Sequence, residues 1–156
     1  PLYTMESDFL IEFLAGHNVA DSDASRILAY QKAQREYIEE ILQRETITEE
    51  IPVIDSEEFG QYPVSLSLSG MFYDQDLSYS YDDYLAHMDH TRAFADSHPN
   101  YKLLSSSTQV FRNLQIRIHE DHTVMISKDK SPAVHFVIHH PKLRSAIENF
   151  VPPVIE

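Results

Sequence analysis

Hydrophobic and polar residues follow two different periods along this chain. Between Glu6 and Arg44 the apolar residues recur every three or four positions, as they do on one face of a helix. Between Pro63 and Phe150 several short stretches alternate apolar and polar residues one by one, which is typical of a strand with one buried side. The pattern predicts an N-terminal helical part and a C-terminal part that mixes strands and helices.

Two helices are predicted in the N-terminal part. The first covers Glu6 to Ala15 and stops at Gly16. The second begins at a cap on Ser22 or Asp23 and continues to about Arg44. A helix of this length often pairs with another helix or another protomer, and packing against its own domain is the alternative.

The C-terminal part begins after an acidic segment, Glu45 to Tyr62, that is interpreted as an irregular joint. A helix capped by Ser80 is expected to end at His98-Pro99, and a last helix is expected to begin at Pro141. The predicted strands are 63–70, 101–105, 114–118, 123–127 and 134–138, with a hairpin at 120–122.

These elements predict an α/β (α+β) fold. We expect a two-layer unit in which a mostly antiparallel sheet carries two helices on one face, preceded by an N-terminal helical arm. The expected domains are the helical arm, residues 1–50, and an α/β regulatory domain, residues 63–151. The arm is a candidate for dimerisation or for transmitting a signal.

Strand alternation divides the predicted sheet into an apolar face and a polar face. A shift of one residue would bury every polar side chain, so the partition is strongly specified. Solvent exposure alone would explain a polar face. Amides, histidines and an arginine are, however, typical of recognition surfaces, and Met125 and Val137 would lie among them. The candidate ligand-binding residues are Ser67, Asn113, Gln115, Arg117, His135 and His139.

Arg117 is expected to pair with an anionic group of a ligand. Asn113, Gln115 and His135 would then fix the orientation of that ligand through hydrogen bonds.

Charge and composition exclude several other functions. With a formal net charge of −13 and scattered basic residues, the chain is expected to contact DNA only through a separate domain. The absence of cysteine excludes disulfides and thiolate sites, and it fits a cytoplasmic protein. Three scattered glycines exclude phosphate-binding loops, and no apolar run is long enough for a membrane span. Because the chain opens on Pro1, we expect it to be a piece of a longer protein.

The nine histidines raise the possibility of a metal-dependent or Ser/His-dependent hydrolase. No recognised metal-binding spacing and no G-x-S-x-G motif is present, so no catalytic residue, metal ligand or cofactor is predicted. The hydrolase stays an alternative hypothesis. The histidines concerned are His87 and His90 beside Asp83, the pair His119 and His122, and the group His135, His139 and His140.

The segment Phe111 to Ile147 has a familiar overall pattern, from Phe111-Arg112-Asn113-Leu114-Gln115-Ile116-Arg117 to His139-His140-Pro141-Lys142-Leu143-Arg144. It resembles the C-terminal domains of bacterial helix-turn-helix transcriptional regulators. The resemblance covers roughly the second half of the chain and transfers no functional residue. It implies a non-catalytic sensing or assembly domain that binds a small-molecule effector or a partner, forms a homodimer and has no membrane attachment. A pure dimerisation module, held together by the helix from Asp23 to Arg44, is a further alternative.

Overall fold

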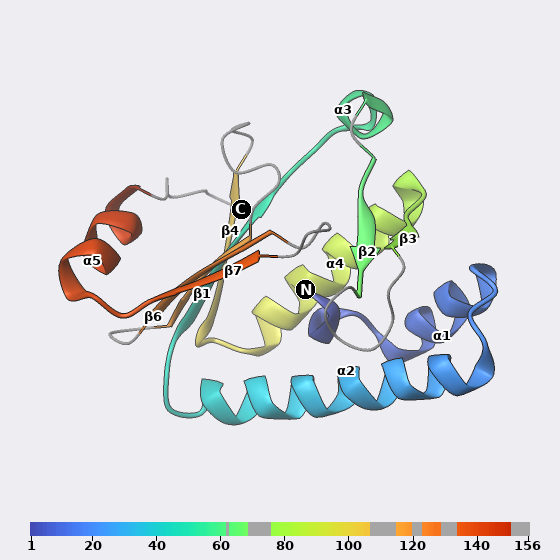
Figure 1. Cartoon of the computed structure of the whole chain (residues 1–156), viewed down its shortest axis with the longest axis horizontal. Helices are drawn as coiled ribbons and strands as arrows, with labels where there is room; N and C mark the ends of the chain where they lie inside the picture. The colour runs from blue at the N-terminus through green and yellow to red at the C-terminus, as the bar shows by residue number, and fades with distance from the viewer. Residues whose placement is uncertain (62, 69–75, 107–114, 120–122, 129–133, 151–156) are drawn as a thin grey trace.

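The computed structural model describes residues 1–61, 63–68, 76–106, 115–119, 123–128 and 134–150. These ranges contain helices together with a mixed five-stranded sheet and a small two-stranded sheet, and the predicted α+β fold class is confirmed (Figure 1). The helices are η1 (Leu2–Thr4), α1 (Ser7–Gly16), α2 (Asp21–Leu42), α3 (Ser56–Gln61), α4 (Tyr81–Ser97) and α5 (Pro141–Phe150). The strands are β1 (Ile47–Pro52), β2 (Ser65–Ser67), β3 (Asp76–Ser78), β4 (Tyr101–Ser106), β5 (Gln115–His119), β6 (Thr123–Lys128) and β7 (Val134–Ile138).

Five of the strands form one sheet in the order β4-β1-β5-β6-β7. The pair β4 and β1 is parallel, and the other three pairs are antiparallel. The expectation of a mostly antiparallel sheet is therefore confirmed, and β7 lies at one edge of it.

The segment Glu45 to Tyr62 is not an irregular joint, as the sequence suggested. It contains β1, which lies between β4 and β5 inside the sheet, and the short helix α3. The acidic pair Glu49-Glu50 concealed the strand, because adjacent carboxylates are rare in the middle of a buried sheet. Both side chains are nonetheless buried, one on each face.

Helices cover both faces of this sheet, which corrects the expectation of two helices on one face. Phe94 of α4 packs with Tyr101 and Leu103 of β4, whereas Ile147 of α5 packs with the cluster that contains Leu104. Neighbouring residues of a strand point to opposite faces, so α4 and α5 lie on opposite sides. Figure 1 shows α5 across the sheet from α2 and α4. We call these two surfaces the α4 face and the α5 face.

The strand β1 contributes to the apolar surface on which α4 packs. Ile47 of β1 joins Tyr101 and Leu103 in a hydrophobic patch on the α4 face of the sheet. This patch, to which the unrecognised strand β1 contributes Ile47, gives α4 an apolar surface to cover.

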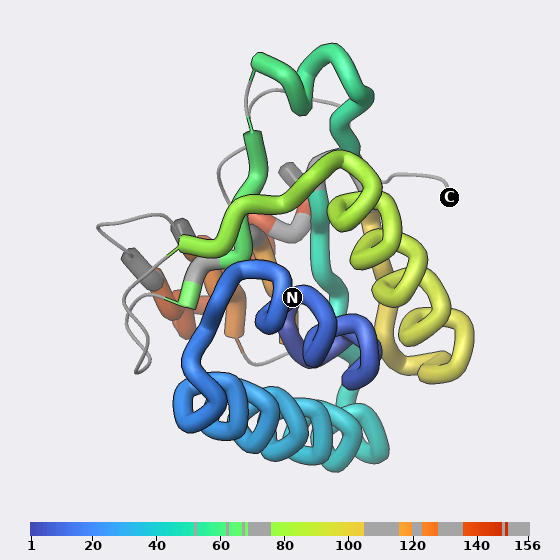
Figure 2. Tube along the Cα trace, turned by 90° about the vertical axis from the view of Figure 1, so that its right-hand side faces the viewer, coloured from blue at the N-terminus to red at the C-terminus, as the bar shows by residue number. Residues whose placement is uncertain are grey.

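The N-terminal helices pack against the rest of the chain. Tyr3 and Ile38 are buried in the cluster that holds Phe94 and Tyr101. Leu10 of α1 and Ile27 of α2 share a second cluster with residues of the 63–90 region, such as Leu66 and Met88. Figure 2 shows α1, α2 and α4 gathered together with the N-terminus among them. The division of the chain into two domains, residues 1–50 and residues 63–151, stays a prediction.

Most of the predicted local signals appear in the structure. Ser80 accepts a hydrogen bond from the Asp83 backbone N–H, and the Asp83 side chain accepts one from Ser80, so the capping box is confirmed. The predicted cap at Ser22 or Asp23 is wrong, because α2 begins two or three residues earlier, after Ala20, and has no side-chain cap. Asp23 instead lies in the first turn, where its charge is favourable beside the helix dipole.

Among the described residues, none of the helices has both the length and the apolar content needed to cross a membrane.

Candidate functional site

A buried polar cluster joins the sheet to the N-terminal segment. Glu49 of β1 and Arg117 of β5 are Cα partners, and Arg117 Nη2 lies 3.5 Å from Glu49 Oε1. Tyr3 Oη donates a hydrogen bond of 2.8 Å to Glu49 Oε2, and Tyr101 Oη donates another to the same oxygen. The guanidinium carbon of Arg117 also lies 5.3 Å from the centre of the Tyr3 ring. The cluster thus links η1, β1, β4 and β5.

The four groups hold one another in defined protonation states. Burial raises the pKa of the Glu49 carboxyl, but the charge of Arg117 and the hydrogen bonds from Tyr101 and Tyr3 outweigh it, so the net shift is downward. Burial and the negative charge of Glu49 raise the pKa values of Tyr3 and Tyr101. Glu49 is therefore an anion that accepts hydrogen bonds from two neutral phenols, and Arg117 supplies the balancing positive charge.

This arrangement corrects the expected role of Arg117. Its guanidinium pairs with a carboxylate of its own chain, and its side chain is only 19% exposed. Glu49 is 1% exposed, so the ion pair is shielded from solvent screening. Arg117 is therefore positioned to hold β5 against β1 and η1.

The other predicted binding residues do not form one group. Ser67 lies in β2, which pairs only with β3 in a separate two-stranded sheet, away from the five-stranded sheet. Asn113 lies outside the described residues. Gln115 and His135 are both Cα partners of Ser127, in the strands on either side of it. His139 follows β7 and is exposed.

Part of the α4 face is open. Arg117, Met125 and Val137 are aligned across β5, β6 and β7, so all three belong to this face. Exposure increases along this row toward the sheet edge, from the largely buried Arg117 to Val137 at 52%. The cover supplied by η1 and α4 therefore does not reach β7.

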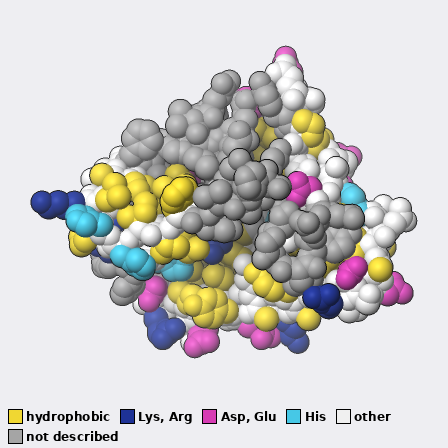
Figure 3. Space-filling model, viewed as in Figure 1, with side chains coloured by type: hydrophobic (Ala, Val, Ile, Leu, Met, Phe, Trp, Pro, Cys, Tyr) yellow, Lys and Arg dark blue, Asp and Glu magenta, His cyan; other side chains and the backbone are white. Residues whose placement is uncertain are grey.

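Apolar side chains are exposed on both sides of β7 and on the neighbouring helix α5. Phe136, on the α5 face, is 60% exposed, and Leu143 of α5 is 51% exposed. Figure 3 shows hydrophobic side chains gathered beside histidines and a basic residue over this part of the molecule. We call this surface the β7–α5 end. It is formed by Phe136, Val137, His139, His140, Lys142 and Leu143.

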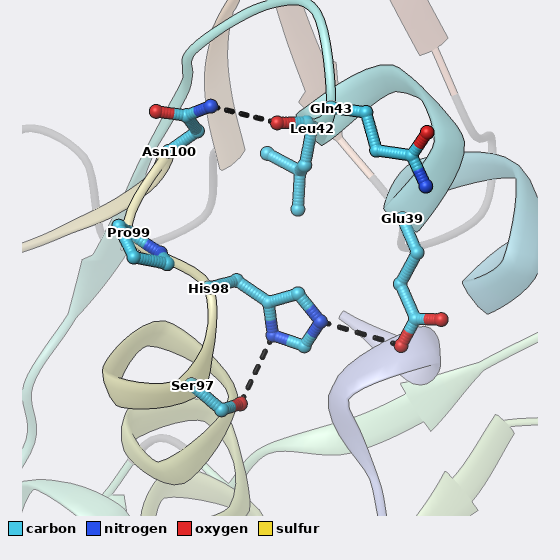
Figure 4. Close-up of a pocket in the computed structure, with 7 residues that line it drawn as sticks. All are labelled: Glu39, Leu42, Gln43, Ser97, His98, Pro99 and Asn100. Carbon is cyan, nitrogen blue, oxygen red and sulfur yellow. Dashed lines mark hydrogen bonds and ion pairs between the residues drawn. The ribbon is translucent and has the colours of Figure 1, made fainter.

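A pocket of about 390 Å³ lies where the C-terminal ends of α2 and α4 meet (Figure 4). The Asn100 side chain donates a hydrogen bond of 2.7 Å to the backbone carbonyl of Leu42 and so ties the two helix ends together. The pocket is lined by Glu39, Leu42, Gln43, Ser97, His98, Pro99 and Asn100.

Ser97, His98 and Glu39 meet in this pocket in an order that superficially resembles a hydrolase triad. His98 Nδ1 lies 2.8 Å from the Phe94 carbonyl, which can only accept, so Nδ1 carries a proton. The Ser97 hydroxyl, 3.0 Å from Nδ1, therefore cannot give its proton to that nitrogen. It lies 3.1 Å from the same Phe94 carbonyl and donates to it. Both side chains cap the C-terminus of α4, which is a structural role.

His87 of α4 has both ring nitrogens bonded within the fold. Tyr79 Oη donates to Nδ1 of His87 over 2.7 Å, and Nε2–H donates to the carbonyl of Pro1 over 2.8 Å. Burial lowers the pKa of His87 to about 3, which matches a neutral ring with one donor and one acceptor nitrogen. No group of three or more histidines and carboxylates with the geometry of a metal site occurs in the described part of the chain.

Sequence reasoning missed Glu49, Tyr3 and Tyr101 as partners of Arg117. Glu49 was placed in an acidic loop, and Tyr3 lies before the first predicted helix. The available signal was the alternation of Ile47, Glu49 and Ile51 along one side of a strand, with a carboxylate at its centre. A lone acid at an inward position predicts a buried basic partner.

Comparisons with known proteins add no relatives. No family model matches the chain, and no curated protein or solved structure has significant similarity to it.

Proposed function

We propose that this chain is a non-catalytic sensing and assembly domain of a bacterial transcriptional regulator that works in the cytoplasm, and that it recognises its partner or effector through the β7–α5 end. The observation that carries the proposal is the exposure of Phe136 and Val137 on opposite faces of an edge strand. Exposed apolar side chains rimmed by polar ones are a mark of interaction sites, and Phe136 lies on the face of the sheet that also carries α5 with its exposed Leu143. The link to a regulator comes from the resemblance of residues 111–147 described above.

The distribution of polar groups favours recognition over catalysis. Glu49 and Arg117 neutralise each other, and His87 is neutral and bonded at both ring nitrogens. A general acid or base needs access to a substrate, and these groups are covered by the chain itself. The exposed residues of the β7–α5 end are suited to contact a surface or a ligand.

The test is carried out on the complete reading frame in the organism that encodes it. We expect Phe136→Glu with Val137→Glu to change the same transcripts as deletion of the gene, because two buried charges would prevent docking. Tyr37→Glu is the matched control, since Tyr37 is an apolar residue of α2 that is 63% exposed. A transcript profile of the β7 variant equal to that of the wild type would overturn the proposal.

The alternative function is a metal-dependent or Ser/His-dependent hydrolase, and among the described residues the pocket beside Ser97 and His98 is where a serine and a histidine meet, although the Ser97 hydroxyl donates to the Phe94 carbonyl and not to His98. In that case the wild-type chain would hydrolyse p-nitrophenyl acetate faster than the Ser97→Ala variant does. Equal rates for the two proteins would remove the support for this alternative.

A further inference from the structure

The edge strand β7 carries the features of a self-complementary interface. It is the outermost strand of the sheet, and its described neighbour is β6 alone. One side of its backbone is therefore available to pair with a further strand. Its two exposed apolar side chains, Phe136 and Val137, lie at and beside the midpoint of the five-residue strand.

The charge distribution selects the side on which a second copy can approach. The chain has a formal net charge of −13, so two copies repel each other over most of their surfaces. Residues 134–147 contain Lys142 and Arg144 with three histidines and no acidic residue. The repulsion between acidic surfaces is consequently reduced where β7 and α5 lie.

From these observations we propose that two copies of the chain dimerise by antiparallel pairing of β7 with β7, which extends the five-stranded sheet across a two-fold axis. The inference rests on the proposed recognition role of the β7–α5 end and names its partner. An antiparallel pair related by a two-fold axis needs an axis perpendicular to the sheet, since this rotation reverses the strand and keeps each residue on its own face.

That symmetry fixes the residues that meet. With the axis at the middle of β7, Phe136 lies opposite Phe136 of the second copy, on the α5 face. The two α5 helices then lie on the same side of the joined sheet, and the exposed Leu143 of each helix is available to cover the phenylalanine pair. On the opposite face, Val137 of each copy lies across from residue 135 of the other copy.

The interface is small. One strand edge about 17 Å long and one helix of about 15 Å give a contact at or below the standard size of about 800 Å² per partner. We therefore expect a dimer with a dissociation constant in the micromolar range, detectable by sedimentation velocity as the concentration is raised.

Single-cysteine variants of the full chain test the register, because the wild-type sequence contains no cysteine. With a short bis-maleimide, Phe136→Cys is expected to form a covalent dimer, since residues opposite each other have Cβ atoms about 5 Å apart. His139→Cys is the matched control; two such residues would lie about 20 Å apart along the paired strands and should not react together. Tyr37→Cys probes a dimer through α2 instead.

A second variant tests whether the dimer can be weakened while the chain stays folded. Phe136→Glu is expected to weaken the dimer about tenfold or more while the circular dichroism spectrum stays that of the wild type. A monomer at all concentrations, cross-linking at Tyr37→Cys or His139→Cys in place of Phe136→Cys, or a dimer unaffected by Phe136→Glu would each overturn this inference. If Phe136→Glu with Val137→Glu still reproduced the gene deletion in cells, the proposed recognition role would stand with a different partner.

Discussion

Glu49 and Arg117 lie directly opposite each other in adjacent antiparallel strands, and their side chains form an ion pair on the covered part of the α4 face. Tyr3 and Tyr101 donate hydrogen bonds to the same carboxylate. The residue that sequence analysis assigned to a ligand is thereby part of the internal framework. The surface left for recognition lies two strands away, at β7.

Breaking the ion pair on one side should be much more harmful than removing both partners. Arg117→Met leaves the Glu49 charge buried without compensation and is expected to lower the free energy of unfolding by about 3–5 kcal/mol. The double variant Glu49→Gln with Arg117→Met should recover a large part of that loss. Urea unfolding measures both values, and a single variant no less stable than the double variant would contradict this account of the cluster.

Removal of one phenol should show the value of the hydrogen bond to a charged acceptor. Tyr101→Phe is expected to cost about 1.5–3 kcal/mol in unfolding free energy, because Glu49 loses one of its donors. Tyr37→Phe is the control, since that side chain is 63% exposed and should change stability by less than about 0.5 kcal/mol. Equal effects of the two substitutions would argue against the hydrogen bond.

The neutral state of His87 predicts a loss of stability in acid. Its pKa is lowered to about 3 in the fold, against an ordinary value of 6.5, so the unfolded chain binds a proton at a higher pH than the folded chain does. The contribution is fully present above about pH 6.5 and decreases as the pH falls toward 3, at up to about 1.4 kcal/mol per pH unit. Thermal unfolding between pH 7 and 4.5 should show this slope.

His87→Gln supplies the control for that experiment. Glutamine can accept from Tyr79 and donate to the Pro1 carbonyl, but it does not titrate. The variant should therefore lose stability less steeply than the wild type over the same pH range. An unchanged slope would mean that other histidines cause the acid sensitivity.

The long helix α2 should behave as a packed helix of its own fold. Ile38 is 3% exposed and lies in the cluster with Phe94, so Ile38→Ala is expected to cost about 2–5 kcal/mol. The adjacent Tyr37→Ala should change stability by less than about 0.5 kcal/mol. The comparison is made by urea unfolding, and a similar cost at both positions would indicate that the outer side of α2 is also covered.

The sequence predicted the elements whose signals are local. The capping box of Ser80 and Asp83, the proline at the start of α5 and the alternation in β5 to β7 need only neighbouring residues, and all three appear in the structure. The assignment of side chains to the two faces of these strands also follows from alternation alone.

The elements that were missed depend on contacts between distant residues. β1 pairs with β4, about fifty positions later, and with β5, about seventy positions later, which no local pattern reports. Two adjacent glutamates in a strand are understandable only after Arg117 is placed beside Glu49. Without β1, the apolar surface under α4 lacked Ile47 and Ile51, and both helices were assigned to one face.

The most direct test of the central claim is amide hydrogen exchange measured at low and at high concentration of the wild-type chain. We expect the amides of β7 that point away from β6 to exchange more slowly as the concentration rises, while those of β5 stay unchanged. Exchange in β7 that is independent of concentration, or new protection on α2, would contradict the assignment of the β7–α5 end as the surface through which this protein assembles.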